Sequence, residues 1–183
     1  LGFVLIYKAT ETINFAQGDI LMLGAFVAFS LIGVLGMNYI VGFILTVMII
    51  AVFGFFLDAV VVRQIIGQPA FATVMLTIGL GFIFRGFASI YWGTDIFSFS
   101  TPFSGKITEV GGLIISYVNI SIIVGTTLLM GILFAFFSFT KIGVAMRASS
   151  ENQLAAYYMG IPVKFIFSLI WSISAGVAAI AGV

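Results

Sequence analysis

Four long stretches of this chain contain no charged residue, and that feature limits the chain to one class of fold. The stretches cover residues 20–57, 64–84, 110–140 and 165–183, and each exceeds the roughly 18 uncharged, apolar residues that indicate a membrane-crossing helix. Hydrophobic residues make up 62% of the chain and charged residues 7%, against about 25% charged residues in soluble domains. We therefore predict an all-α fold, a polytopic transmembrane helical bundle with about five to six spans.

The longest stretch, residues 20–57, is too long for one span, and Gly33, Gly36 and Asn38 mark the place where we expect it to break. Residues 1–7 are typical of the end of another span, and the chain stops inside an apolar stretch. We therefore expect residues 1–183 to form a single transmembrane domain that is truncated at both ends. The other spans are predicted at residues 20–36, 39–57, 70–92 and 118–139 and from residue 163 onward, with boundary errors of about two to four residues.

Basic residues fix the orientation of the predicted spans, because they gather on the cytoplasmic side of a membrane. Alternating spans place segments 8–19, 58–68 and 140–164 on one side and the loop 93–117 on the other, where Lys106 is the one basic residue. We therefore predict that residues 140–164 form a cytoplasmic loop and residues 93–117 an extracytoplasmic loop. The basic residues on the predicted cytoplasmic side are Lys8, Arg63, Lys141, Arg147 and Lys164.

Several functions are disfavoured by what the sequence lacks. It contains no histidine and no cysteine, so it offers neither the commonest general base and metal ligand nor a disulfide framework. It also lacks the glycine-rich phosphate loop of an ATPase, and a net charge of +1 gives no reason to expect nucleic acid as a partner. We therefore expect a protein that is not an enzyme, with no catalytic residues, no metal and no cofactor.

The predicted cytoplasmic loop contains the signals of a short helix. Ser149 or Ser150 could cap the helix, and Glu151 and Asn152 would lie in its first turn, where negative charge suits the helix dipole. Gly160 could end it in the left-handed conformation. The helix would be about nine residues long and would lie along the membrane surface. It is either a solvated connector between two spans or a surface that another protein approaches.

Three stretches of the chain carry family motifs. The loop has Gly143, Arg147, Glu151, Asn152, Ala155, Ala156, Gly160 and Ile161. The N-terminal stretch has Ile13, Asn14, Phe15, Ala16, Gly18 and Asp19, and the C-terminal stretch has Trp171, Ser172, Ser174, Ala175, Ala178, Ala179, Ala181 and Gly182. The loop resembles the EAA-type coupling loop of bacterial ABC importer permeases. The other two stretches resemble the branched-chain amino acid permeases of the LivH kind, and the resemblance covers nearly the whole chain.

The resemblance implies the permease subunit of an ABC importer in the bacterial inner membrane, which moves leucine, isoleucine or valine and is driven by separate ATPase subunits. It also implies a periplasmic solute-binding protein outside, and a second permease subunit with which we expect a heterodimer in the lipid bilayer. In such permeases the short cytoplasmic helix inserts into a groove on the ATPase. The implied coupling surface consists of Arg147, Glu151, Asn152, Ala155, Ala156 and Gly160.

Polar residues beside the apolar spans are candidates for the substrate pathway. The segment from Asn14 to Asp19 could dip into the bundle, where non-helical backbone is tolerated if it is buried or lines water. Otherwise it is a cytoplasmic turn in which Asp19 caps the next span. Arg85 lies about 22 Å along its span at 1.5 Å per residue, where it could bind a carboxylate, snorkel to the headgroups or pair within the protein. The candidate pathway residues are Asn14, Gln17, Asp19, Thr73, Thr77 and Arg85.

Small residues spaced by four mark one face of the last predicted span. This spacing lets helix backbones approach each other closely. We expect these residues to pack within the bundle, and a dimer contact is the alternative. The candidate packing residues are Ser172, Gly176, Ala179 and Gly182.

Other functions remain as alternatives. An ion-coupled secondary transporter or channel needs buried carboxylates or histidines to carry protons, and the predicted spans after residue 39 have none in their apolar interiors. An integral-membrane enzyme needs a nucleophile and a base, and the sequence offers no such pair. A related ABC importer for urea, short amides or another small solute fits the same residues.

Overall fold

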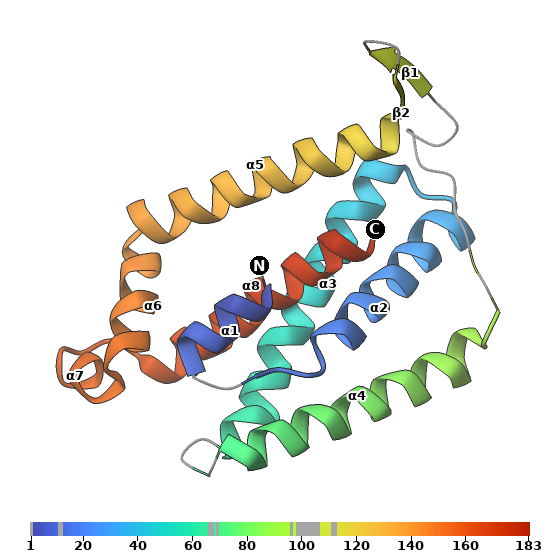
Figure 1. The fold of residues 1–183 in the computed structure, drawn as a ribbon. Coiled ribbons are helices and arrows are strands. Elements are labelled where there is room, and N and C mark those ends of the chain that lie inside the picture. The colour runs from blue at the N-terminus through green and yellow to red at the C-terminus, as the bar shows by residue number, and fades with distance from the viewer. Residues whose placement is uncertain are drawn as a thin grey trace.

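The computed structural model describes residues 2–10, 13–65, 68, 70–95, 97, 107–110 and 113–183 (Figure 1). The all-α class is confirmed, because five helical segments among the described residues are long and apolar enough to cross a membrane. The elements in chain order are α1 (Gly2–Thr10), α2 (Gln17–Ala28), the π-helix η1 (Phe29–Val34), α3 (Tyr39–Val60), the 3₁₀-helix η2 (Val62–Ile65), α4 (Ala70–Trp92), β1 (Ile107–Val110), β2 (Leu113–Ser116), α5 (Tyr117–Phe139), α6 (Lys141–Glu151), α7 (Gln153–Tyr158) and α8 (Val163–Gly182).

The longest uncharged stretch breaks at Gly36 and Asn38, as predicted, whereas Gly33 lies inside the helical segment η1. Helix α2 continues into η1, and Gly36 then adopts a φ of +64°, which glycine tolerates because it has no Cβ. Asn38 caps α3 by accepting the backbone N–H of Ile40 at 3.0 Å. The result is two spans in place of one.

Helix α8 forms the centre of the bundle, with α1, α2 and α3 packed around it (Figure 1). A Cβ added to Gly24 of α2 would lie 2.9 Å from the Cα of Ala179, and one added to Gly54 of α3 would lie 2.7 Å from the carbonyl oxygen of Trp171. These distances leave no room for a side chain, so the backbones of α2 and α3 approach α8 directly.

The four candidate packing residues of α8 face different neighbours. Ala179 is fully buried against α2. A Cβ added to Gly176 would lie 3.6 Å from that of Ala51 in α3, and one added to Gly182 would lie 2.6 Å from the carbonyl oxygen of Leu21 in α2. Ser172 is half-buried. The small residues therefore let two different helices approach α8.

Helices α4 and α5 lie on opposite sides of this core (Figure 1). The C-terminal ends of α2, α4 and α8 and the N-terminal ends of α3 and α5 lie toward the same end of the bundle, as alternating spans require. Helix α4 packs against α2, whereas α5 has no buried residue. A short antiparallel hairpin precedes α5, with Ile107 of β1 opposite Ser116 of β2. The hairpin belongs to the predicted loop 93–117, in which residues 96, 98–106 and 111–112 lie outside the described residues.

Candidate functional site

A break between α1 and α2 gathers polar groups of the Asn14–Asp19 segment inside the bundle. The Nδ2 of Asn14 donates to the Oε1 of Gln17 at 3.2 Å, and the Oδ1 of Asn14 accepts the backbone N–H of Ala16 at 3.0 Å. The Nε2 of Gln17 donates to the carbonyl oxygen of Ser174 in α8 at 3.1 Å. Asn14 is 2% exposed and Ala16 is fully buried, so this non-helical backbone is closed off by protein.

The break lies near the middle of the bundle. Ser174 is about 17 Å along α8 at 1.5 Å per residue, and its hydroxyl donates to the carbonyl oxygen of Gly2 at 2.8 Å. Thr77 is about 10 Å along α4, and its hydroxyl accepts the backbone N–H of Phe15 at 3.3 Å. Thr73 is buried one turn before Thr77. The sequence analysis left two alternatives for the segment from Asn14 to Asp19, a cytoplasmic turn or a segment that dips into the bundle. The structure has the second arrangement.

Asp19 and Arg85 form an ion pair between α2 and α4. Asp19 does not cap the span, which was one of the two alternatives for this segment. Helix α2 begins at Gln17, and the Asp19 carboxylate accepts from the Nε of Arg85 at 2.6 Å and from its Nη2 at 3.4 Å. Gly81 provides the space, since a Cβ there would collide with the Oδ2 of Asp19. The Asp19 side chain is 8% exposed and that of Arg85 is 63% exposed. A buried carboxylate is therefore neutralised by a cation that remains accessible.

Two short helices, in place of the single predicted one, connect α5 to α8. Thr140 caps α6 by accepting the backbone N–H of Gly143 at 3.0 Å, and Asn152 caps α7 by accepting the backbone N–H of Ala155 at 2.9 Å. Gly160 adopts a φ of +80° after α7, as its position predicts. The two helices, α6 and α7, are called the α6–α7 element below.

The predicted caps at Ser149 and Ser150 are wrong. Both residues lie within α6, where Ser149 is fully buried and the hydroxyl of Ser150 donates back to the carbonyl oxygen of Met146 at 2.8 Å. A serine that bonds to its own helix in this way does not end it. Glu151 is consequently the last residue of α6, and Asn152 is the cap of α7 and not part of its first turn.

Most of the predicted coupling residues lie on the surface of this element. Arg147, Glu151, Asn152, Ala155 and Gly160 are exposed. Ala156 is only 4% exposed, so it does not form part of the exposed surface of this element.

Helix α7 also presents large apolar side chains that the sequence analysis did not include. Tyr158 and Met159 are more than 80% exposed, and Leu154 and Tyr157 are also exposed. Residues 154, 157 and 158 follow the i, i+3, i+4 spacing of one helix face. This spacing in the sequence could have predicted the apolar face of α7. A short helix with such a face suits contact with another protein.

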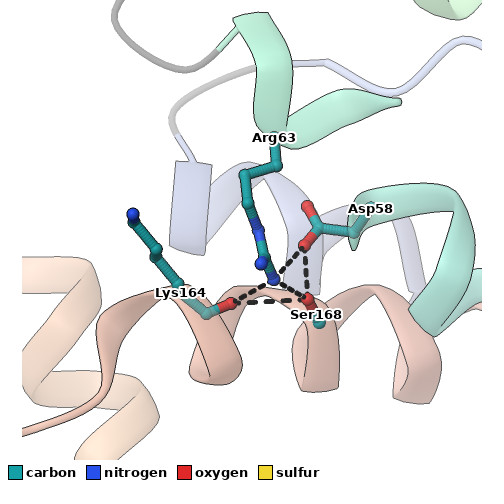
Figure 2. Close-up of polar contacts among 4 residues, drawn as sticks. All are labelled: Asp58, Arg63, Lys164 and Ser168. Carbon is teal, nitrogen blue, oxygen red and sulfur yellow. Dashed lines mark hydrogen bonds and ion pairs between the residues drawn. The ribbon is translucent and has the colours of Figure 1, made fainter. Parts of the chain in front are cut away.

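A second polar cluster, which the sequence analysis missed, joins α3 to α8 (Figure 2). The hydroxyl of Ser168 donates to the Oδ2 of Asp58 at 2.7 Å. The Nη2 of Arg63 donates to the Ser168 hydroxyl at 2.6 Å and to the carbonyl oxygen of Lys164 at 3.0 Å, and lies 3.7 Å from the Oδ2 of Asp58. Asp58 is 1% exposed and Ser168 is fully buried. The sequence analysis placed Asp58 in the segment 58–68 between two spans. In the structure Asp58 lies inside α3, which ends at Val60.

The geometry is that of a membrane bundle with a buried helix break and a short two-helix element between two spans. The family model described as "Branched-chain amino acid transport system / permease component" matches residues 1–183. The chain belongs to this family. The description of this family names a permease component of a transport system.

Curated relatives of the permease family agree with this assignment. The chain is 26% identical to the high-affinity branched-chain amino acid transport system permease protein BraD of Pseudomonas aeruginosa. The alignment covers the whole chain and 64% of that protein. It is 27% identical to the LivH permease protein of Salmonella typhimurium and 26% identical to that of Escherichia coli K12, spanning 63% of each. The chain thus spans less than two thirds of the length of these relatives. No solved structure matches it.

Proposed function

We propose that this chain is the membrane-spanning part of an ABC importer permease that carries leucine, isoleucine or valine into the cell, driven by separate ATPase subunits. The named function of the permease relatives supports the solute. The observation that carries the coupling to an ATPase is the α6–α7 element, which presents an exposed apolar face and joins the central helix α8 through Gly160 and the residues up to Pro162.

The α6–α7 element is suited to transmit movement into the bundle. Both of its helices are capped by side chains, Thr140 and Asn152, and such caps stiffen short helices that would be marginal alone. Helix α8 contacts α1, α2, α3 and α6. A force on the exposed face of α7 is therefore passed to α8, and through α8 to the helices that pack against it. The proposed coupling residues are Arg147, Glu151, Asn152, Ala155, Gly160, Leu154, Tyr157, Tyr158 and Met159.

The helix break at Asn14 is the proposed part of the substrate pathway. Broken helices at membrane depth supply backbone amides and half-helix ends to small charged solutes in other transporters. The guanidinium of Arg85 is exposed and can bind the carboxylate that an amino acid carries at neutral pH, while the buried Asp19 carboxylate holds it in place. The proposed pathway residues are Asn14, Gln17, Asp19, Thr73, Thr77 and Arg85.

The proposed assembly places residues 140–164 in the cytoplasm against the ATPase and residues 93–117 outside, facing a solute-binding protein. The excess of basic residues in segments 8–19, 58–68 and 140–164 supports this orientation. We place the protein in the inner membrane of a bacterium, paired with a second permease subunit as a heterodimer. The unburied surface of α5 is available for such a neighbour.

ATP hydrolysis by the assembled complex tests the proposal. The full-length permease is reconstituted into proteoliposomes with its ATPase subunits and binding protein, and hydrolysis is measured with the binding protein empty and loaded with leucine. We expect leucine to stimulate hydrolysis several-fold and radiolabelled leucine to accumulate only with ATP. Stimulation by urea or acetamide in place of leucine would favour the small-solute importer. Uptake that needs no ATPase would refute an ABC importer.

A further inference from the structure

The Asp58–Arg63–Ser168 cluster lies where the α6–α7 element joins the bundle. Lys164 and Ser168 belong to the first two turns of α8, which begins shortly after α7. Asp58 lies in the last turn of α3, and Arg63 lies in η2, ahead of α4. A displacement of α7 therefore reaches these hydrogen bonds within the first two turns of α8.

Both charges of the cluster come from the α3 side of the contact. Asp58 and Arg63 belong to neighbouring segments, whereas α8 contributes the neutral hydroxyl of Ser168 and the carbonyl oxygen of Lys164 (Figure 2). A buried charge that loses its partner is strongly unfavourable. Here the two charges remain together if α8 moves away, so the contact can open without leaving either charge unpaired.

The hydrogen bonding of Arg63 points to a second arrangement of the same residues. The Nη2 atom makes the contacts to Ser168, Lys164 and Asp58, while the buried Nε has no hydrogen-bond partner among the residues that the structure describes. A guanidinium favours two parallel hydrogen bonds to a carboxylate. Once Ser168 leaves the Oδ2 of Asp58, Arg63 can turn Nε and Nη2 together toward that carboxylate, which satisfies the donor that is unpaired in the present arrangement.

We propose that Asp58, Arg63 and Ser168 are positioning residues whose contact between α3 and α8 is made in one nucleotide state of the transporter and released in the other. The contact passes the movement of the α6–α7 element to α3 and α4. This inference rests on the proposed importer function. It assigns the Asp58 carboxylate to coupling and not to the substrate pathway.

Variants at Ser168 test the hydroxyl without touching either charge. In the reconstituted complex, Ser168→Ala is expected to lower the stimulation of ATP hydrolysis by the loaded binding protein about tenfold, because one hydrogen bond to a charged group shifts a two-state equilibrium by about that factor. Ser168→Thr keeps the hydroxyl and is expected to retain most of the stimulation. Thr46→Val is the matched control, since it also removes a buried hydroxyl, and the Thr46 hydroxyl donates to the carbonyl oxygen of Gly42 within its own helix at 2.8 Å. ATPase binding is expected to match wild type in all three variants. The melting temperature is expected to match wild type in Ser168→Thr and in the control, and to fall by a few degrees in Ser168→Ala, because the buried Asp58 carboxylate loses one hydrogen bond.

Cross-linking measures the contact itself. The rings of Phe55 in α3 and Phe165 in α8 lie 5.9 Å apart beside the cluster, and the chain contains no cysteine. In a Phe55→Cys, Phe165→Cys variant, the yield with a short thiol cross-linker is expected to differ several-fold between the nucleotide-free complex and the complex trapped with ATP. Adding Ser168→Ala is expected to remove most of this difference.

The outcomes separate this inference from the proposed function. If wild type shows no ligand-stimulated hydrolysis, the importer function fails and the coupling role fails with it. If wild type is stimulated but Ser168→Ala is stimulated equally, the cluster has no role in coupling. Equal loss in the Ala and Thr variants would assign the effect to packing and overturn the inference, as would a cross-linking yield that is the same in both nucleotide states.

Discussion

The close contact between α3 and α8 predicts that Gly54→Ala destabilises the permease. A methyl group at this position would lie 2.5 Å from the Cβ of Ala175 and 2.7 Å from the carbonyl oxygen of Trp171, whereas carbon atoms pack at about 3.5–4.0 Å. The carbonyl belongs to the backbone and cannot rotate aside. Helix α3 must therefore move about 1 Å away from α8.

The expected loss of stability is about 1–2 kcal/mol. Overpacking a tight core costs about 1–3 kcal/mol, and the gain of replacing glycine by alanine inside a helix, about 0.5–1 kcal/mol, offsets part of this. For a chain of this size, each 1 kcal/mol lowers the melting temperature by about 2–4 °C. Gly54→Ala should therefore melt several degrees below wild type.

Gly79→Ala in α4 is the matched control, because a Cβ added there meets no atom of the described residues within 4 Å outside its own helix turn. The assay is thermal unfolding of the detergent-purified permease, and Gly79→Ala is expected to melt at or slightly above the wild-type temperature. Adding Ala175→Gly to Gly54→Ala removes the shorter contact and should recover part of the loss. If Gly54→Ala proves as stable as Gly79→Ala, the direct backbone contact between α3 and α8 is refuted.

Three further substitutions test the element and the helix break. Asn152→Ala removes the cap of α7, which costs about 1 kcal/mol, and should weaken binding of the ATPase about fivefold in a pull-down titration; unchanged binding would contradict a role for α7. Gly160→Val forces a branched side chain into a φ of +80° at a cost of about 1–2 kcal/mol. The variant should still assemble but should move less solute per ATP hydrolysed. An unchanged ratio of solute moved to ATP hydrolysed would contradict the proposal that α7 transmits movement into the bundle. Asn14→Ala leaves the buried N–H of Ala16 without its acceptor, which costs about 1–3 kcal/mol, and an unaltered melting temperature would show that the break is not held by this bond.

The spans could be predicted from the sequence because lipid imposes a length and a composition on each helix. The break at Gly36 and Asn38 followed from local chemistry, a left-handed glycine and a helix cap, and no distant residue was needed to find it. These features depend on a few consecutive residues, which is why they were predictable.

Contacts between distant residues were not predictable in the same way. Asp19 has the chemistry of a helix cap, but its carboxylate is taken by Arg85, 66 residues away. Asp58 ends an uncharged stretch and resembles an ordinary boundary residue, yet its hydrogen-bond partner Ser168 lies 110 residues further along the chain. Neither pairing leaves a mark in the local sequence.

The cap between α6 and α7 shows a third limit. Ser149, Ser150 and Asn152 are all good caps, so local preference alone did not choose among them. The structure buries Ser149 within α6, and this tertiary contact leaves the cap to Asn152. Propensity therefore predicted a short helix near the correct place but did not predict that there are two.

The most direct test of the account is whether Tyr158, the most exposed tyrosine of α7, faces the ATPase in the cytoplasm. A single cysteine is introduced by Tyr158→Cys, and Ile90→Cys near the C-terminal end of α4, where the side chain is 89% exposed, serves as the control. We predict that a membrane-impermeant thiol reagent labels Tyr158→Cys only from the cytoplasmic side and that a bifunctional reagent joins it, but not Ile90→Cys, to the ATPase subunit. Labelling of Tyr158→Cys from outside the cell, or no cross-link to the ATPase, would contradict the account.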